Sequence, residues 1–583
     1  MSQKIKFFPI RHPESDSSDE GSPRNLFNIF IKFFLITIFF ISIFLRLYKL
    51  DILPLFGDEA DVGYHAYSLL KTAKDYKGNL LPFYIDSLAE SRAPLLMYTT
   101  IPFVLLFGLN PIAVRLPSVV FAILAIVYLY KLVKIQTKNS NLALLSSVFL
   151  GLSNWHFHYS RTAFEVSLLL TLILSGTYYF YKSLKKNQSF SPYLYLSIFI
   201  FSLSFYTYNT ANIFTPLLVI FLILTNFKEI KKQATKKQAP AFLALFLLFP
   251  LAKNILSGSA ANRFKLIGIF NNPKITEEII TKRTGFSATD SETERIFYNK
   301  LTKTLNIFTN NYLSSLSFNF LFRSGDPNPR HSPSDFGLLP ITFLPLLLFG
   351  FFSINKNKKN GKANQLMFFW LLIAPIPTSL TIDGGTQATR LFLILPPLIY
   401  FVSKGFLAIT NKSKIITILI ITSLSINMIF YYRNYFVRYP KDSFQSWQYG
   451  YQQLMQSIPS NTNRLFISNS NYTSLIHYLF YSKYPPQSLH QSNFTDKTVD
   501  NFYQDLSGFK LNDQIFFVTN WNATSTIDKI AKIAQSSDTF VLFQLLDIPG
   551  DWDLSKNPPD GFKTIDTVYL PNNLIFAQII QKL

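Results

Sequence analysis

The sequence has 583 residues, of which 49% are hydrophobic, 15% are charged and 60 are phenylalanine. Repeated apolar runs of about 20 residues are typical of a polytopic α-helical membrane protein, because a run of that length spans the hydrocarbon core of a bilayer. The net charge of +22 lies mostly in short lysine clusters between these runs, which argues against nucleic acid as the partner. The absence of cysteine excludes disulfides, thiolate metal sites and cysteine nucleophiles.

The N-terminal part predicts a tail followed by a membrane anchor. Residues 1–25 are polar and rich in serine and aspartate, which favours a disordered cytoplasmic tail. The apolar run 26–48 lacks a small-residue cleavage site, so we interpret it as an uncleaved first span. Ten further spans are predicted, at 113–133, 141–158, 163–181, 191–207, 212–227, 239–256, 338–354, 365–380, 389–406 and 414–432. The expected transmembrane domain therefore covers residues 26–432 with about eleven helices.

Lysine clusters orient these spans. They follow every second predicted span, at Lys131, Lys134 and Lys138; Lys182, Lys185 and Lys186; Lys228, Lys231, Lys232, Lys236 and Lys237; Lys356, Lys358, Lys359 and Lys362; and Lys404, Lys412 and Lys414. The positive-inside rule places these loops and the N-terminus in the cytoplasm. An odd number of spans then sends the C-terminal segment outside, in a multi-pass plasma-membrane protein.

One apolar stretch, Pro94–Gly108, does not fit the alternation. It is only 15 residues long, shorter than the roughly 20 residues of a full span, and treating it as a span would invert the lysine pattern. We interpret it as a helix that lies at the membrane surface, with a short twelfth span as the alternative.

The predicted external loops carry acids and arginines that the apolar runs lack. The first loop, 49–112, contains the stretch Phe56–Asp61, and carboxylates beside a bilayer usually mark a functional site. The candidate residues come from four loops: Asp58, Glu59 and Arg92 in the first; His158, Arg161 and Glu165 in the second; Arg263, Asp326, Arg330 and His331 in the large loop 257–337; and Arg390 in the fifth. Their grouping on one face predicts a composite active site. No ligand spacing supports a metal centre.

The C-terminal part, 433–583, differs from the rest in its pattern. Strand-like runs occur at 464–468, 514–519, 539–545 and 574–580, and helical patterns at 442–457, 472–482 and 525–535. These runs predict a small soluble domain of the α/β or α+β class outside the membrane. No catalytic motif is visible in it.

Several ordered motifs carry a family resemblance. The segments GDEADVGYHAYSLLKTAKDYKG, SRAPLLMY, FGLNPIAVRLPS and NWHFHYSRTAFE, and later NYLSSLSFNFLFRSGDPNPRHS and ATRLFLILPPL, are spread over roughly 26–440. They resemble the bacterial branch of the protein O-mannosyltransferase-like family. That family belongs to the C-type glycosyltransferase superfamily, which includes the lipid A aminoarabinose transferases.

The resemblance implies an activity and roles for particular residues. It implies inverting transfer of a sugar from a polyprenyl-phosphate donor to a protein, lipid or glycan acceptor on the external face, with no required cofactor. In similar enzymes an acid of the first loop is the general base, and that position falls on Asp58, with Glu59 beside it. Glu165 matches a second acidic site residue. Arg92 and Arg390 match positions that bind the lipid phosphate.

The chain departs from the family pattern at two places. Ser91-Arg92 stands where relatives often carry Tyr-Lys, which keeps the charge, since arginine also binds phosphate. Gln387 stands where relatives often carry histidine, so any role that needs a protonated imidazole there is in doubt.

Other interpretations of these residues remain open at this stage. The acids can serve as helix caps, the arginines can bind membrane lipid headgroups, and the histidines can pack beside Trp155. A transporter or flippase of a lipid-linked sugar is the alternative function. Such a transporter should show internal repeats and ionisable groups at the bilayer midplane, whereas the acids here gather at one surface.

Overall fold

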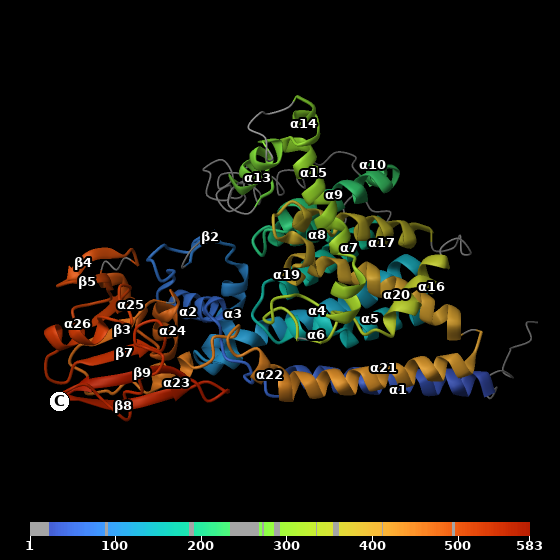
Figure 1. Cartoon of the computed structure of the whole chain (residues 1–583). Coiled ribbons are helices and arrows are strands. Elements are labelled where there is room, and N and C mark those ends of the chain that lie inside the picture. The colour runs from blue at the N-terminus through green and yellow to red at the C-terminus, as the bar shows by residue number, and fades with distance from the viewer. Residues whose placement is uncertain are drawn as a thin grey trace, which may run out of the picture.

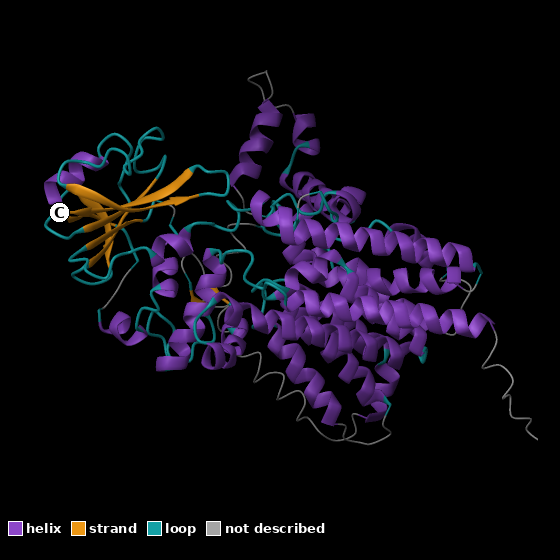
Figure 2. Cartoon of the chain, turned by 90° about the horizontal axis from the view of Figure 1, so that it is seen from below, coloured by secondary structure: helices purple, strands orange, loops and turns teal. Residues whose placement is uncertain are grey.

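The computed structural model describes residues 23–87, 91–185, 192–233, 268–270, 273–284, 292–333, 335–353, 361–410, 412–470, 472–492 and 496–583. It consists of a helical bundle, followed by a domain built on a seven-stranded sheet at one end of the bundle (Figure 1). Figure 2 shows that the strands of this sheet gather at that end. The predicted tail 1–25, except for its last three residues, and the predicted span 239–256 lie outside the described residues.

The helices of the first half are α1 (Pro23–Leu47), α2 (Gly57–Thr72), α3 (Leu95–Phe107), α4 (Pro111–Thr137), α5 (Ser140–Leu152), α6 (Asn154–Ser160), α7 (Val166–Leu184), α8 (Pro192–Ser204), α9 (Ala211–Thr225) and α10 (Phe227–Gln233), with a two-stranded sheet of β1 (Ile85–Asp86) and β2 (Ser91–Arg92). Then follow α13 (Pro273–Thr284), α14 (Glu292–Phe297), α15 (Lys300–Ser314), the π-helix η1 (Asn319–Arg323), α16 (Phe343–Phe352), α17 (Gly361–Ile373), α18 (Ile376–Ser379), the 3-10 helix η3 (Gly384–Thr386), α19 (Ala388–Leu391), the 3-10 helix η4 (Phe392–Ile394), α20 (Leu395–Thr410), α21 (Lys414–Arg433), the π-helix η5 (Asn434–Arg438) and α22 (Tyr439–Asp442).

The apolar character of the bundle agrees with a membrane protein. Among the described residues, three helical stretches are long and apolar enough to cross a bilayer: Pro111–Thr137, Ala388–Thr410 and Lys414–Asp442. The long helices α1 and α21 lie side by side (Figure 1), and the Tyr432 hydroxyl donates to Ser42 Oγ at 2.9 Å between them. The number of spans and their orientation stay predictions.

Two predicted spans are interrupted, each for a local reason. The span expected at 141–158 ends as α5 at Leu152, because Ser153 adopts an extended conformation and its Oγ accepts from the His156 N–H to start α6. The span expected at 365–380 is split into α17 and α18 before Pro375, which cannot donate to a helical ladder.

The stretch Pro94–Gly108 forms α3. Its 13 residues make a helix of about 20 Å, short of the roughly 30 Å hydrocarbon core. Leu105, Leu106 and Phe107 at its C-terminal end are exposed. Its position at the membrane surface stays a prediction.

The sheet of the C-terminal part has the order β4-β5-β6-β3-β7-β9-β8, with β6, β3 and β7 parallel and the other pairs antiparallel. The elements are α23 (Tyr451–Gln456), β3 (Leu465–Ser468), α24 (Ser474–Tyr481), α25 (Pro486–Gln491), β4 (Val499–Tyr503), β5 (Leu506–Lys510), β6 (Ile515–Val518), α26 (Thr526–Ile533), β7 (Thr539–Phe543), β8 (Phe562–Tyr569) and β9 (Ile575–Lys582). The sequence predicted β3, β6, β7 and β9. It missed the edge strands β4 and β8 and the internal strand β5, because polar residues or glycine interrupt the apolar run in each of them.

The C-terminal part packs directly on α2. Phe480 of α24 lies against Gly63, where an added Cβ would overlap its ring. The Tyr64 hydroxyl donates to the carbonyl of Tyr484 at 2.8 Å. Residues of α2, α24 and the sheet therefore share one apolar core.

We predict that the crossing of α16 and α20 depends on glycine. A Cβ added to Gly350 would overlap the carbonyl oxygen of Phe401, and one added to Gly405 would overlap that of Leu346. Gly350→Ala should therefore destabilise the fold by about 1–3 kcal/mol through overpacking, measured as a lower thermal midpoint in detergent. Gly361→Ala is the control, because nothing lies within 4 Å of that Cβ. Equal midpoints for the two variants would contradict the close crossing.

Candidate active site

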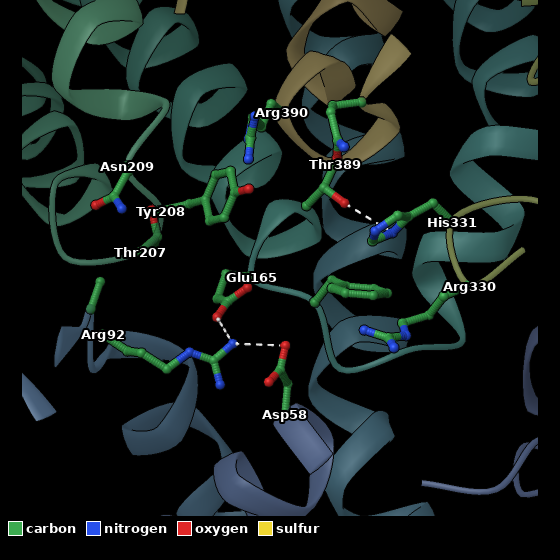
Figure 3. Close-up of a pocket in the computed structure, with 13 residues that line it drawn as sticks. Asp58, Arg92, Glu165, Thr207, Tyr208, Asn209, Arg330, His331, Thr389 and Arg390 are labelled. Atoms are coloured by element: carbon green, nitrogen blue, oxygen red, sulfur yellow. Dashed lines mark hydrogen bonds and ion pairs between the residues drawn. The ribbon is translucent and has the colours of Figure 1, made fainter. Parts of the chain in front are cut away.

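A cavity opens where six separate segments of the chain meet (Figure 3). Its volume is about 170 Å³, and it is open to solvent on one side. The lining residues are Asp58, Arg92, Ala93, Phe164, Glu165, Thr207, Tyr208, Asn209, Arg330, His331, Gln387, Thr389 and Arg390. They include six of the predicted site residues, which the fold brings together from loops more than 300 positions apart in sequence.

Arg92 organises the acidic part of this cavity. Its Nη2 lies 3.6 Å from Asp58 Oδ2 and 3.4 Å from Glu165 Oε1, and its Nη1 lies 3.4 Å from Asp61 Oδ2. One guanidinium thus faces three carboxylates (Figure 3 shows the first two contacts). Arg92 is therefore already paired with acids in this structure, and its predicted contact with the lipid phosphate stays a prediction.

Asp61 anchors Arg92 from below the cavity surface. It is fully buried, and Ser87 Oγ donates to its Oδ2 at 2.7 Å. Burial opposes the charged form of Asp61, but the neighbouring His65, Arg92 and the Ser87 hydrogen bond outweigh this effect and lower its pKa. Asp61 therefore stays ionised and holds the guanidinium in place.

Asp58 is the accessible carboxylate of the group. It lies in the first turn of α2, and its side chain is 55% exposed, whereas that of Glu165 is 9% exposed and that of Asp61 is not exposed. A group that takes a proton from an incoming acceptor must be reachable from the cavity. Of these three carboxylates, Asp58 meets this condition best.

Glu59, the other acid predicted to be catalytic, has a structural position. It is fully buried and pairs with Arg115, whose Nε and Nη2 donate to its two oxygens at 2.9 and 2.5 Å. Its Oε1 also accepts from the Ala163 N–H at 2.8 Å. Both oxygens point away from the cavity, so this geometry gives Glu59 a role in folding in place of the predicted catalytic one.

Arg330 and Arg390 supply positive charge to the cavity. The guanidinium of Arg330 lies 4.3 Å from the centre of the Phe56 ring, and its Nε donates to the Ser446 carbonyl at 3.0 Å. Arg330 makes no ion pair among the described residues. Arg390 donates from Nη1 to Thr381 Oγ1 at 2.8 Å and to Asp383 Oδ1 at 3.0 Å. Figure 3 places it across the cavity from Arg92.

The turn that carries Arg330 is held by Asp326. Its Oδ1 accepts from the Asn328 N–H at 2.8 Å, and its Oδ2 accepts from the Ala388 N–H at 2.7 Å. Asp326 therefore joins the turn 325–332 to α19 and does not line the cavity, so it is a positioning residue and not the predicted substrate ligand. Burial raises its pKa to about 6, although the two backbone hydrogen bonds act in the opposite direction.

His331 lines the cavity as an uncharged group. Its Nδ1 lies 3.2 Å from the Tyr159 hydroxyl and 3.2 Å from Thr389 Oγ1, and these two oxygens are 2.8 Å apart. Burial, together with the charge of Arg330, lowers the pKa of His331 to about 3. Imidazole in this environment is neutral near pH 7 and can hydrogen-bond to a sugar without adding charge.

Two other predicted site residues have structural positions. Arg161 is buried, and its Nη1 and Nη2 donate to backbone carbonyls at the end of α1. These carbonyls belong to Leu45 and Arg46 in the last turn and to Tyr48 and Lys49 just after it. His158 is also buried, and its Nε2 lies 2.8 Å from the Arg330 carbonyl. Arg161 therefore caps a helix end, and His158 supports the Arg330 turn, in place of the substrate contacts that the sequence predicted. Arg263 lies outside the described residues.

Part of the cavity lining was not predicted from the sequence. Thr207, Tyr208 and Asn209 come from the connection between α8 and α9, and Thr389 precedes the predicted Arg390. The signal was present, because residues 206–212 form a polar run rich in tyrosine, threonine and asparagine between two apolar spans. Within the described part of the chain, no group of three His, Asp or Glu side chains is arranged to hold a metal ion.

Comparisons with known proteins agree with the motifs. Residues 91–252 match the family model described as dolichyl-phosphate-mannose-protein mannosyltransferase, which confirms the predicted resemblance. A comparison with curated protein sequences finds no match.

Solved structures share the fold. The chain resembles ArnT from Cupriavidus metallidurans in the apo state, with a TM-score of 0.52 and 9% identity over 95% of this chain and 98% of that one. The form bound to undecaprenyl phosphate gives a TM-score of 0.51 and 10% identity over 94% and 97%. An Archaeoglobus fulgidus oligosaccharyltransferase is more distant, with a TM-score of 0.42 and 12% identity over 78% of this chain and 64% of that one.

We predict a pH dependence of stability that Asp326 causes. Between its ordinary pKa of 3.8 and the folded value of about 6, the folded state binds more protons than the unfolded state. The contribution of Asp326 to stability is therefore greatest below about pH 4 and is lost as the pH rises through 6. The thermal midpoint of the wild type, relative to that of Asp326→Asn, should fall between pH 4 and pH 7. A difference that stays constant or grows over this range would contradict the assignment.

Proposed function

We propose that this glycosyltransferase, which the match over residues 91–252 relates to the dolichyl-phosphate-mannose-protein mannosyltransferases, moves a sugar from a polyprenyl-phosphate donor to an acceptor with inversion at the anomeric carbon. The observation that carries the proposal is the composition of one cavity. An accessible carboxylate, Asp58, faces the same space as two arginines that come from distant loops, Arg330 and Arg390.

The reaction needs groups of both kinds. The acceptor hydroxyl is a weak nucleophile, so Asp58 takes its proton as the oxygen attacks the anomeric carbon. The bond between that carbon and the phosphate oxygen breaks, and the lipid phosphate leaves with the electron pair. Arginine binds phosphate oxygens in pairs and remains charged at any physiological pH, so Arg330 and Arg390 stabilise the charge that develops on the leaving group.

The remaining cavity residues position these groups. Arg92 links Asp58 to Glu165 and Asp61, which keeps the base directed at the cavity. Neutral His331, Tyr208 and Asn209 offer hydrogen bonds to sugar hydroxyls. This assignment separates the carboxylate-binding arginine from the phosphate-binding arginines. It changes the pairing expected from the sequence, in which Arg92 and Arg390 shared the phosphate.

The carrier and the side of the membrane follow from different observations. An ArnT structure contains undecaprenyl phosphate. We assign a sugar linked to a polyprenyl phosphate as the donor of this chain. The lysine clusters favour a cytoplasmic location for alternate loops, which supports our proposal that the cavity and the C-terminal domain lie on the external side.

Replacement of the proposed base should reduce turnover without loss of the fold. Asp58→Asn keeps the shape of the side chain but removes the proton acceptor, so kcat should fall by roughly two orders of magnitude or more. The assay is transfer of radiolabelled sugar from synthetic polyprenyl-phosphate donors by the purified protein. Asp51→Asn, an exposed residue in the turn after α1, is the matched control and should leave kcat unchanged. Near-normal turnover of Asp58→Asn would exclude Asp58 as the base.

Loss of a phosphate-binding arginine should weaken donor binding. Arg330→Ala removes a charged hydrogen bond worth about 1.5–3 kcal/mol, so the KM for the donor should rise about tenfold or more. Arg330→Lys should recover only part of this loss, because an ammonium group lacks the paired geometry of guanidinium. Arg323→Ala, an exposed arginine of η1, is the control. An unchanged donor KM in Arg330→Ala would remove Arg330 from the phosphate site.

The topology can be tested on the intact cell, because the chain has no native cysteine. A cysteine introduced at exposed Asp551 in the C-terminal domain should react with a membrane-impermeant thiol reagent. A cysteine at exposed Lys362, at the start of α17, should react only after the membrane is permeabilised. The reverse pattern would refute the orientation.

A further inference from the structure

The segment Ser446–Gln448 connects the membrane bundle to the sheet domain and contacts both sides of the cavity. The carbonyl of Ser446 accepts from Arg330 Nε at 3.0 Å. Two residues later, Gln448 Oε1 accepts from the Gly57 N–H at 2.6 Å. Gly57 directly precedes Asp58, the proposed base. The segment Ser446–Gln448 therefore binds both the backbone next to Asp58 and the side chain of Arg330, a proposed phosphate ligand.

Trp447 makes this segment rigid. Its side chain is fully buried, and its Nε1 donates to the Tyr439 hydroxyl at 3.0 Å. Its ring meets the Phe56 ring edge-to-face at a centroid distance of 5.5 Å, and Phe56 in turn lies under the Arg330 guanidinium. A buried tryptophan with a satisfied N–H has little freedom to move, so the two flanking hydrogen bonds keep a fixed separation.

The start of α2 needs an outside partner. The first N–H groups of a helix have no acceptor within the helix, and Phe56 at the N-cap position supplies no side-chain hydrogen bond. Gln448, 391 positions away in the sequence, supplies the acceptor for Gly57. This is a cap provided by the C-terminal part of the chain to the helix that carries Asp58.

The backbone of Gln448 supports a specific role for its side chain. Its φ of 50° lies in the left-handed region, which favours glycine and is unfavourable for residues with a side chain. A glutamine held there against this preference is explained by the two contacts of its amide oxygen.

His477 of α24 fixes the orientation of the Gln448 amide. Its Nε2 lies 3.1 Å from Gln448 Oε1. Burial lowers the pKa of His477 to about 3, so the ring is neutral. The Gly57 N–H can only donate, so the amide oxygen of Gln448 faces it. The same oxygen then accepts from His477, which makes Nε2 the protonated nitrogen of that ring.

We propose that Gln448 is a positioning residue for the transfer reaction: it caps α2 from the C-terminal part and sets the place of Asp58 relative to Arg330. This inference rests on the proposed function of Asp58. It assigns the C-terminal part a role within the active site, through a hydrogen bond that acts on the base without contacting the substrate.

The test separates the side chain of Gln448 from its backbone. Gln448→Gly removes the acceptor but suits the left-handed backbone, so the fold should be retained, with a thermal midpoint close to that of the wild type because loss of the cap and relief of the backbone act in opposite directions. Displacement of a catalytic group by about 1 Å can reduce a rate about 100-fold. We expect kcat to fall by about 10- to 100-fold, with an unchanged donor KM. Gln448→Glu keeps an acceptor oxygen and should recover most of kcat. Gln453→Ala, an exposed glutamine of α23, is the matched control.

A second measurement does not depend on activity. Hydrogen–deuterium exchange of the first turn of α2 should be faster in Gln448→Gly than in the wild type and in Gln453→Ala, because the Gly57 N–H has lost its acceptor. Wild-type kcat together with wild-type exchange in Gln448→Gly would overturn the proposal.

The same assays distinguish the two levels of the argument. If Asp58→Asn is inactive while Gln448→Gly turns over like the wild type, the positioning role fails and the proposed function stands. If Asp58→Asn turns over normally, the proposed function itself fails, whatever the exchange data show. A loss of kcat in Gln448→Gly that Gln448→Glu does not recover would also count against the cap.

Discussion

The buried pair of Glu59 and Arg115 is the constraint on which the site depends. Arg115 in α4 donates to both oxygens of Glu59 and also to the carbonyls of Leu50, Leu53 and Pro54. Glu59 in turn accepts from the backbone just before α7. One ion pair therefore ties four segments of the chain together. Removal of either partner would leave an uncompensated buried charge, which is unfavourable by about 3–5 kcal/mol, so neither residue is free to act on a substrate.

This arrangement explains why adjacent acids have different roles. Successive residues of a helix point about 100° apart, so when Glu59 faces the bundle, Asp58 must face another direction. That direction is the cavity, where Asp58 is more than half exposed and meets Arg92. The ion pair of Glu59 with Arg115 thus directs the side chain of Asp58 into the cavity. Sequence alone could identify the Asp58-Glu59 pair, but the division of roles depends on a partner 56 positions away.

The same distinction limits what the sequence could predict about the other site residues. Asp58, Arg92, Glu165, Arg330, His331 and Arg390 were predicted from charge on one face and from ordered motifs, and all of them line one cavity. Arg161 and His158 satisfied the same criteria, yet their polar atoms bind backbone carbonyls of α1 and of the Arg330 turn. Charge and spacing indicate which side chains lie near the external surface. They do not indicate whether a backbone group or open space lies opposite each one.

The fold shows a similar limit. Long apolar runs predicted the helical bundle, and buried β-branched and aromatic runs predicted four central strands of the sheet. The strands β4, β5 and β8, and the breaks after α5 and α17, depend on single residues and on neighbours that no local pattern contains.

The helix α2 is held from two directions, which accounts for the close association of the bundle with the C-terminal part. Glu59 fixes it to the membrane helices, while Phe480, Tyr484 and Gln448 fix it from the C-terminal side. The same connecting segment contacts Arg330 through Ser446, so a shift of the C-terminal part would move the base and one of the cations together. In a reaction that needs a proton acceptor and phosphate-binding groups at a fixed separation, a shared support preserves that separation better than two independent loops.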